Sequence, residues 1–222
     1  MRLFIFLTLL LLTACRNPEA VSLKPMEAYY YPYDQLAHQT SFTYQKVGGH
    51  EQAIITQQII ERGGTKFLAT VIGDKTIKFD SAIATLDEPP KLVEIFRYEY
   101  DTLGNFRGMT QGTIEKEAYF ANGTPYGGRK SHIKYVHRNI ETAYETMDHF
   151  KKDTVYEWNN VATPALYFER TLHIEVGHRY IPFLGKSATY AGYTIYAKAL
   201  GIVKYANELD GELVAWELIS IE

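Results

Sequence analysis

Apolar and polar side chains alternate along much of the chain after Tyr29, which is the pattern of half-buried β-strands. The clearest stretch runs from residue 166 to residue 176, and its apolar face carries Leu166, Phe168, Leu172, Ile174 and Val176. Successive side chains of an extended chain point to opposite sides, so we predict a strand here, with Phe168, Leu172 and Ile174 on the core side. Arg170 lies on the same face and is the one residue that does not fit.

Seven further stretches alternate in the same way or are rich in β-branched and aromatic residues, and each predicts a strand. They are Phe42–Val47, Ala53–Glu61, Lys66–Ile72, Thr76–Phe79, Leu92–Tyr100, Thr113–Phe120 and Leu213–Ile221. Turn-forming residues separate them, at Gly48-Gly49, Gly63-Gly64, Gly73-Asp74, Leu103-Gly104-Asn105 and Asp210-Gly211. The short spacings leave no room for crossover helices, so the sheet should be antiparallel.

The stretch Arg138–Lys151 is open to two interpretations. Ile140, Tyr144, Met147 and Phe150 are close to helical spacing, which indicates a short helix. A strand fits the same residues equally well.

An antiparallel sheet of this many strands must curl, close or split in two to bury its apolar face. We therefore predict an all-β fold with a single strongly curved antiparallel sheet or half-open β-barrel, in preference to a flat sandwich, and with one short helix as an option. The concave side of such a sheet can bind an apolar ligand or be filled by the protein's own side chains.

The first residues predict a bacterial lipoprotein precursor. One positive charge, Arg2, precedes an apolar run from Leu3 to Leu12 in which only Thr8 is polar. This run is too short to cross a bilayer, which needs roughly 20 apolar residues, but it has the length of a signal-peptide core. Leu12-Thr13-Ala14-Cys15 matches the lipobox, in which the cysteine sulfur receives a diacylglycerol and the signal peptide is cut just before it. We therefore predict a signal peptide at residues 1–14 and lipidation at Cys15.

A tether follows the lipidation site. Residues 15–28 contain two prolines and no clear period, so we expect the lipidated Cys15 and a flexible linker there, followed by one β-rich domain at residues 29–222. The linker spans at most about 45 Å. Arg16 is not the aspartate that retains lipoproteins in the inner membrane of enteric bacteria. This favours an outer-membrane location, facing the periplasm or the cell surface, with the membrane as a partner through the lipid.

Composition excludes several other classes. Cys15 is the only cysteine, so once it is acylated the fold has neither disulfides nor thiol chemistry. The net charge of −3 comes without any basic run, which argues against a nucleic-acid partner. The histidine pairs His132/His137 and His173/His178 are each five residues apart, so in a strand the two members face opposite sides. We expect no metal and no cofactor.

A search for enzyme motifs finds little. The chain has no Gly-x-Ser-x-Gly, no Ser-x-x-Lys and no Cys-His arrangement. The carboxylates Glu94, Glu99, Glu115 and Glu117 could form a glycosidase pair, but alternating strands place such residues outward more often. The segment Tyr126-Gly127-Gly128-Arg129 matches no phosphate-binding pattern and is interpreted as a loop.

Tyrosine is the most unusual feature of the composition. The chain has 18 tyrosines, and Tyr29, Tyr30, Tyr31 and Tyr33 cluster where the domain begins. A tyrosine combines an apolar ring with a polar tip, so it suits a sheet rim, a carbohydrate or peptide surface, or the mouth of a cavity. Half-buried strands also favour tyrosine for packing alone, and both interpretations remain open.

The two ends of the chain resemble an uncharacterised family of all-β bacterial envelope lipoproteins. In the C-terminal part the residues are Tyr193-Thr194-Ile195-Tyr196-Ala197-Lys198 and Gly201-Ile202-Val203-Lys204, followed by Glu212–Leu218; in the N-terminal part they are Tyr30-Tyr31-Pro32 and Phe42-Thr43-Tyr44. This chain departs from the family pattern at Ala199, where the family has glycine, and at 35–40, which lack a glycine. The resemblance covers about a quarter of the chain and implies an all-β envelope domain without established activity, similar in architecture to half-open-barrel lipoprotein carriers.

The function that these features favour is a non-enzymatic binding role, with an apolar ligand or a partner protein held in or on the curved sheet. The alternative is a surface or assembly scaffold that engages envelope proteins through a sheet edge or the tyrosine-rich patch. A hydrolase of envelope polymers is the third hypothesis, and it would require two facing carboxylates.

Overall fold

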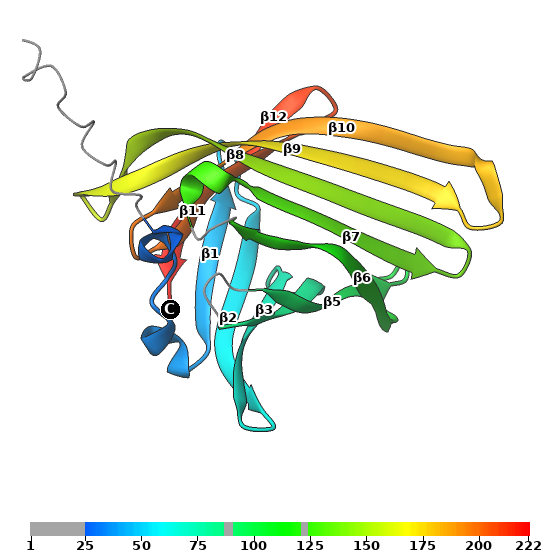
Figure 1. Ribbon diagram of the computed structural model, residues 1–222, viewed down its shortest axis with the longest axis horizontal. Coiled ribbons are helices and arrows are strands. Elements are labelled where there is room, and N and C mark those ends of the chain that lie inside the picture. Colours follow the sequence, from blue (N-terminus) through cyan, green and yellow to red (C-terminus); the bar gives the residue numbers. More distant parts are fainter. Residues whose placement is uncertain (1–24, 87–90, 121–123) are drawn as a thin grey trace, which may run out of the picture.

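Twelve antiparallel strands follow one another around a closed barrel in the computed structural model, which describes residues 25–86, 91–120 and 124–222 (Figure 1). The strands are β1 (Thr40–Lys46), β2 (Gln52–Arg62), β3 (Thr65–Gly73), β4 (Lys78–Thr85), β5 (Leu92–Tyr100), β6 (Phe106–Phe120), β7 (Arg129–His137), β8 (Ile140–Trp158), β9 (Val161–His178), β10 (Ile181–Ala197), β11 (Gly201–Leu209) and β12 (Glu212–Ile221). Short 3₁₀ turns lie at η1 (Met26–Tyr29), η2 (Tyr33–Ala37) and η4 (Pro125–Gly127). Each strand pairs with its neighbours in sequence, and the all-β antiparallel prediction is confirmed.

The barrel closes between the first and last strands. β1 pairs with β12 from Phe42 opposite Ile221 to Lys46 opposite Trp216. Backbone hydrogen bonds join Ser41 and Glu222 in both directions, at 2.7 and 2.9 Å. The curved sheet therefore closes on itself, and each of the twelve described strands is paired on both sides.

The helical interpretation of Arg138–Lys151 is wrong, because this stretch forms the turn after β7 and the first part of β8. The register places Tyr144 opposite Ile133 and Asp148 opposite Arg129, so even-numbered residues share the inner face. That face carries threonines and a buried aspartate as well as apolar residues. These polar positions hide the period of two and leave an apparent helical spacing.

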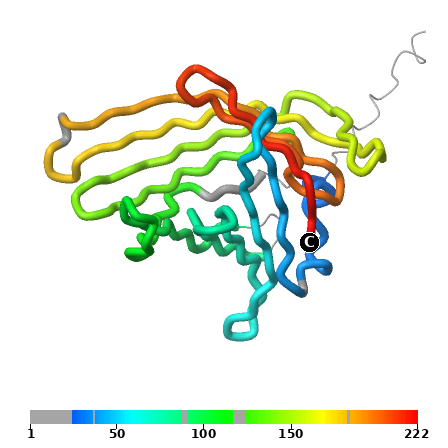
Figure 2. The backbone as a smooth tube through the Cα atoms, turned by 180° about the vertical axis from the view of Figure 1, so that it is seen from behind, coloured from blue at the N-terminus to red at the C-terminus, as the bar shows by residue number. Residues whose placement is uncertain are grey.

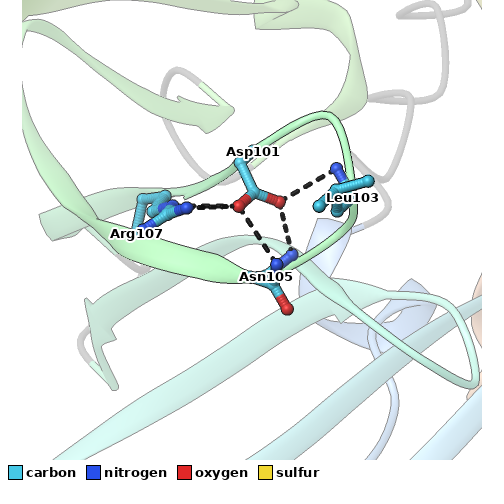
Figure 3. Close-up of polar contacts among 4 residues, drawn as sticks. All are labelled: Asp101, Leu103, Asn105 and Arg107. Carbon is cyan, nitrogen blue, oxygen red and sulfur yellow. Dashed lines mark hydrogen bonds and ion pairs between the residues drawn. The ribbon is translucent and has the colours of Figure 1, made fainter.

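Several strand boundaries differ from those predicted. The predicted strand at Thr76–Phe79 begins at Lys78 and continues to Thr85, and the prediction at Thr113–Phe120 covers only the second half of β6. In the turn between β5 and β6, the Asp101 carboxylate accepts hydrogen bonds from the backbone N–H groups of Leu103 and Asn105, at 2.9 and 2.8 Å (Figure 3). The Arg107 Nε donates to the same carboxylate at 3.0 Å. These contacts fix the turn before β6 begins.

Burial is concentrated at one end of the barrel, where the N-terminal segment packs. One cluster contains Leu36 of η2 with Phe42, Tyr44, Val203 and Leu218, and a second contains Met26 and Tyr29 of η1 with Leu166, Phe168 and Tyr196. The long strands β8, β9 and β10 extend beyond the other strands on the opposite side (Figures 1 and 2). The side chains of the N-terminal segment thus complete the hydrophobic core at this end of the barrel.

The packed part of the chain includes residues before Tyr29. Met26 is only 1% exposed, and the carbonyl of Ala28 accepts a 2.9 Å hydrogen bond from the Ala199 amide, so residues 25–28, which we assigned to the tether, pack on the barrel. The predicted signal peptide at residues 1–14, the predicted lipidation site Cys15 and residues 16–24 lie outside the described residues. Among the described helical segments, none has the length and apolar character needed to cross a membrane.

Candidate ligand-binding site

A cavity of about 200 Å³ lies inside the packed end of the barrel. Its wall comes from β1, β2, β3, β7, β10 and β11, the turn after β10, and the N-terminal segment from Tyr30 to the start of η2. Because these strands belong to separate arcs of the barrel, the space they enclose is the barrel interior. Six aromatic residues line it, namely Tyr30, Tyr31, Tyr33, Phe42, Tyr44 and Tyr196, together with the polar side chains of Gln57 and Arg129. We call this space the tyrosine cavity.

Packing fixes the aromatic wall. The rings of Tyr31 and Phe42 meet edge to face, with their centroids 5.0 Å apart. Tyr44 is 3% exposed, and its hydroxyl donates a 2.7 Å hydrogen bond to the carbonyl of Ile202. Behind the wall, the ring of Tyr196 contacts that of Phe168 at 5.5 Å. The cavity is therefore formed by side chains that already have partners and does not need rearrangement to exist.

Three charged side chains form a buried cluster at the base of the cavity. Asp148 is fully buried, and Arg170 donates to both of its carboxylate oxygens, from Nε at 2.7 Å and from Nη2 at 3.3 Å. Arg129 approaches the same carboxylate from β7, with Nε 2.9 Å from Oδ2. Although this distance is short, the buried Nε–H of Arg129 is not aligned on any acceptor among the described residues. The Nε–H of Arg129 therefore contributes electrostatic attraction to Asp148 without an aligned hydrogen bond.

A glycine places Arg129 opposite Asp148. Gly128 has a φ of +61°, in the left-handed region, and a Cβ there would lie 2.7 Å from the carbonyl oxygen of Asp148. Only glycine combines this conformation with this close approach. The segment 126–129, which we interpreted as a loop, contains the end of η4 and the first residue of β7. That residue is Arg129, and it faces the interior.

The cluster stays ionised at neutral pH. Burial opposes the charge on Asp148, but the attraction of Arg129 and Arg170 outweighs it and holds the pKa of this carboxyl below its usual range. Burial also disfavours the charge on Arg129, yet its neighbours, Tyr196 first and then Asp148, raise its pKa above the ordinary value. The base of the cavity is therefore a charged site.

The tyrosine cluster at the domain entrance proves to be divided between two roles. Tyr30, Tyr31 and Tyr33 line the cavity, whereas Tyr29 is 4% exposed and packs in the core with Met26. The tyrosines of β1 and β10 complete the wall, and their positions gave no separate signal in the sequence. Both interpretations of the tyrosine content thus apply, each to different residues.

The core-face residues of β9 lie on the inner face as predicted. Phe168 is fully buried, and Leu172 and Ile174 are half-buried on the same face, further from the packed end. Arg170, the misfit in the pattern, occupies the inner face because Asp148 lies directly opposite it on β8. The alternating pattern indicates that Arg170 is a misfit but does not identify Asp148 as its partner.

A second arginine lies further along the inner face. Arg97 is placed between the rings of Tyr135 and Tyr144, 4.4 and 4.7 Å from their centroids, and its Nε donates to Asp80 at 3.1 Å. The positive charge of Arg97 is balanced by the negative charge of Asp80. This pair fills the interior instead of lining the tyrosine cavity.

The other candidate residues are distributed over strands and paired locally. His132 lies 3.1 Å from Glu115, and His137 lies 2.6 Å from Glu99. Glu94 forms an ion pair with Arg62 at 2.9 Å, while the side chain of Glu117 lies outside the described residues.

Among the described residues, no group of three or more His, Cys, Asp or Glu side chains could hold a metal ion. The barrel is closed, so the described strands leave no free sheet edge through which a scaffold protein could pair with a partner.

Comparisons with known proteins show the fold. No protein-family model matches the chain, and no curated protein sequence matches it either. Two solved structures are similar: a candidate lipoprotein from Parabacteroides distasonis, with 12% identity and a TM-score of 0.54, and a candidate exported protein with a YmcC-like fold from Bacteroides fragilis, with 12% identity and a TM-score of 0.52. In each comparison the match covers 88% of this chain and 99% of the other. At this identity the likeness establishes that the three proteins share one all-β fold.

Proposed function

We propose that this protein is a lipid-anchored protein of the bacterial cell envelope that binds a small ligand in the tyrosine cavity and catalyses no reaction. The cavity is the observation that carries this proposal, because it is preformed, lies inside a closed barrel and combines apolar rings with a few polar groups. The lipobox at Cys15 supports the anchor. The two similar structures, one from a candidate lipoprotein and one from a candidate exported protein, fit the same location.

The anchor and the cavity are close in sequence. Nine residues lie between Cys15 and Pro25, where the described chain begins, so whatever their conformation this stretch spans at most about 35 Å. The residues that follow pack beside the cavity and then line it at Tyr30 and Tyr31. A ligand in the cavity would thus be held close to the membrane surface.

The size of the cavity favours a compact ligand. Sites for drug-sized molecules start at about 300 Å³, and the tyrosine cavity, at about 200 Å³, is smaller. A long acyl chain would leave most of its length outside, and the wall includes the charged Arg129. The cavity suits a ring-sized group better than the purely apolar ligand expected from the strand pattern.

Native mass spectrometry of the full chain, purified from its membrane, tests the proposal. We expect a small molecule to copurify, and Gln57→Trp, which places an indole in the cavity, to abolish this binding. Gln58→Trp is the matched control, because Gln58 is the next residue on β2 and is exposed on the outer face. Equal ligand retention in both variants would place binding elsewhere, and a ligand-free wild-type protein in every preparation would remove the basis for a binding role.

A further inference from the structure

The buried cluster beside the tyrosine cavity has one positive charge too many. Arg129 and Arg170 together carry two positive charges, and Asp148 supplies one negative charge. Arg170 alone already satisfies both carboxylate oxygens of Asp148. Arg129 is therefore not needed to neutralise Asp148, and keeping an extra charge in the interior is costly unless something compensates it.

The neighbouring tyrosines cannot supply the missing negative charge. Burial raises the pKa of Tyr30 and of Tyr196, so both phenols are neutral at physiological pH. Asp148 is the one carboxylate in contact with Arg129 among the described residues. No second carboxylate among the described residues compensates this charge, which leaves a ligand as a source of the compensation.

Arg129 is placed where a ligand can reach it. It lines the cavity, and 23% of its side-chain surface remains accessible, while Asp148 behind it is completely buried. The planar guanidinium of an arginine matches the two oxygens of a carboxylate. One excess charge calls for one negative charge, which favours a carboxylate over a doubly charged phosphate.

We propose that the tyrosine cavity binds a monocarboxylate whose body is about the size of one six-membered ring, with Arg129 meeting the carboxylate and the tyrosine rings enclosing the body. This inference rests on the proposed ligand-binding role and gives the ligand its chemical class. The body can be aromatic, a sugar ring or a short aliphatic chain, since tyrosine rings pack against all three and their hydroxyls accept or donate hydrogen bonds.

Calorimetric titration of the full chain in lipid nanodiscs distinguishes these three kinds of ligand body. The probes are benzoate, glucuronate and hexanoate, each compared with a neutral partner: benzamide, glucose and hexanol. Phenyl phosphate tests the preference for a single charge. We expect at least one carboxylate to bind at least tenfold more tightly than its neutral partner, because the neutral molecule leaves the charge on Arg129 uncompensated.

Variants at Arg129 complete the test. Arg129→Gln should weaken carboxylate binding at least tenfold, and Arg129→Lys should recover part of the loss, because it restores the charge without the planar fork. Asp148 keeps Arg170 as its partner in both variants, so the fold should persist, which circular dichroism checks. Arg62→Gln is the control, since it removes the same charge from an exposed ion pair with Glu94 and should leave binding unchanged.

The outcomes separate this inference from the proposed function. Three results would overturn the carboxylate assignment while leaving a ligand-binding cavity in place. Neutral probes could bind as tightly as carboxylates, phenyl phosphate could bind more tightly than benzoate, or Arg129→Gln could keep full affinity. If no probe binds at about 10 mM, which corresponds to a binding free energy of only about 3 kcal/mol, the carboxylate assignment fails. The native mass spectrometry then decides separately whether any ligand is bound.

Discussion

Asp148 holds two arginines in the barrel interior, and Asp148→Asn tests the energetic account of this cluster. The substitution keeps the size of the side chain but removes its charge, so the cluster changes from one excess positive charge to two. Breaking a buried ion pair in this way costs about 3–5 kcal/mol, because the remaining charges stay buried without compensation. For a domain of this size each kcal/mol lowers the melting temperature by about 2–4 °C, so we expect a decrease of roughly 6–20 °C.

Urea unfolding followed by circular dichroism measures the loss, and Glu169→Gln provides the control. Glu169 is next to Arg170 on β9 but faces outward, where it pairs with Lys151 at 2.9 Å and both side chains are more than half exposed. Such an exposed pair contributes less than about 1 kcal/mol. Replacing Arg170 by methionine in the Asp148→Asn background should restore part of the stability, since it removes one of the orphaned charges.

The pH dependence gives an independent check on the sign. The pKa of Asp148 is lower in the folded protein than in the unfolded chain, so its contribution to stability is complete above the unfolded value of about 3.9 and is lost as the pH falls through the folded value. The stability difference between the wild-type protein and Asp148→Asn should therefore shrink in acid. A loss below about 1 kcal/mol at neutral pH would refute the account of a buried, obligatory counter-charge.

Three further predictions address other parts of the molecule. Ala199 has a φ of +59°, so Ala199→Gly should raise the free energy of unfolding, measured by urea titration, by about 0.5–1 kcal/mol. The reason is that the relief of left-handed strain exceeds the entropic cost of a more flexible unfolded chain, and a decrease in the free energy of unfolding would contradict it. Burial raises the pKa of Tyr156 and Tyr205 to about 12, so stability should fall as the pH rises from about 10 through 12, and a tyrosinate absorbance titration without late-ionising groups would disprove it. Cys15→Ser should abolish membrane fractionation and leave the signal peptide attached, and unchanged processing would refute the lipidation prediction.

The strand pattern predicted the class of fold because an amphipathic strand needs only local information. The stretch 166–176 forms part of β9, with its even-numbered residues on the inner face. Closure could not be predicted in the same way, since the pairing of Phe42 with Ile221 joins the two ends of the chain and depends on the accumulated twist and stagger of all the strands between them. The alternation specifies which side of a strand is buried, and it does not specify how far the sheet curls.

The backbone at Ala199 adopts the left-handed conformation that glycine favours. The resemblance described in the sequence analysis implies a glycine at this position. The amide of Ala199 still donates to the carbonyl of Ala28, which ties the turn after β10 to η1. The local conformation is thus set by the fold and tolerated by alanine at some energetic cost.

The candidate site escaped prediction because a single extra residue in β8 decides which charges meet. The hairpin turn at Asn159-Asn160 pairs Trp158 with Val161, and if this register continued unchanged, Asp148 would lie opposite Thr171 and Arg170 would lie on the other face of the sheet. A bulge between Phe150 and Lys152 adds one residue to β8 and shifts the register, so that Asp148 lies directly opposite Arg170. Two residues that each look like a defect in an apolar face become a buried ion pair only after this shift. The excess charge of Arg129, and with it the chemistry of the cavity, follows from a bulge that the amino-acid pattern does not announce.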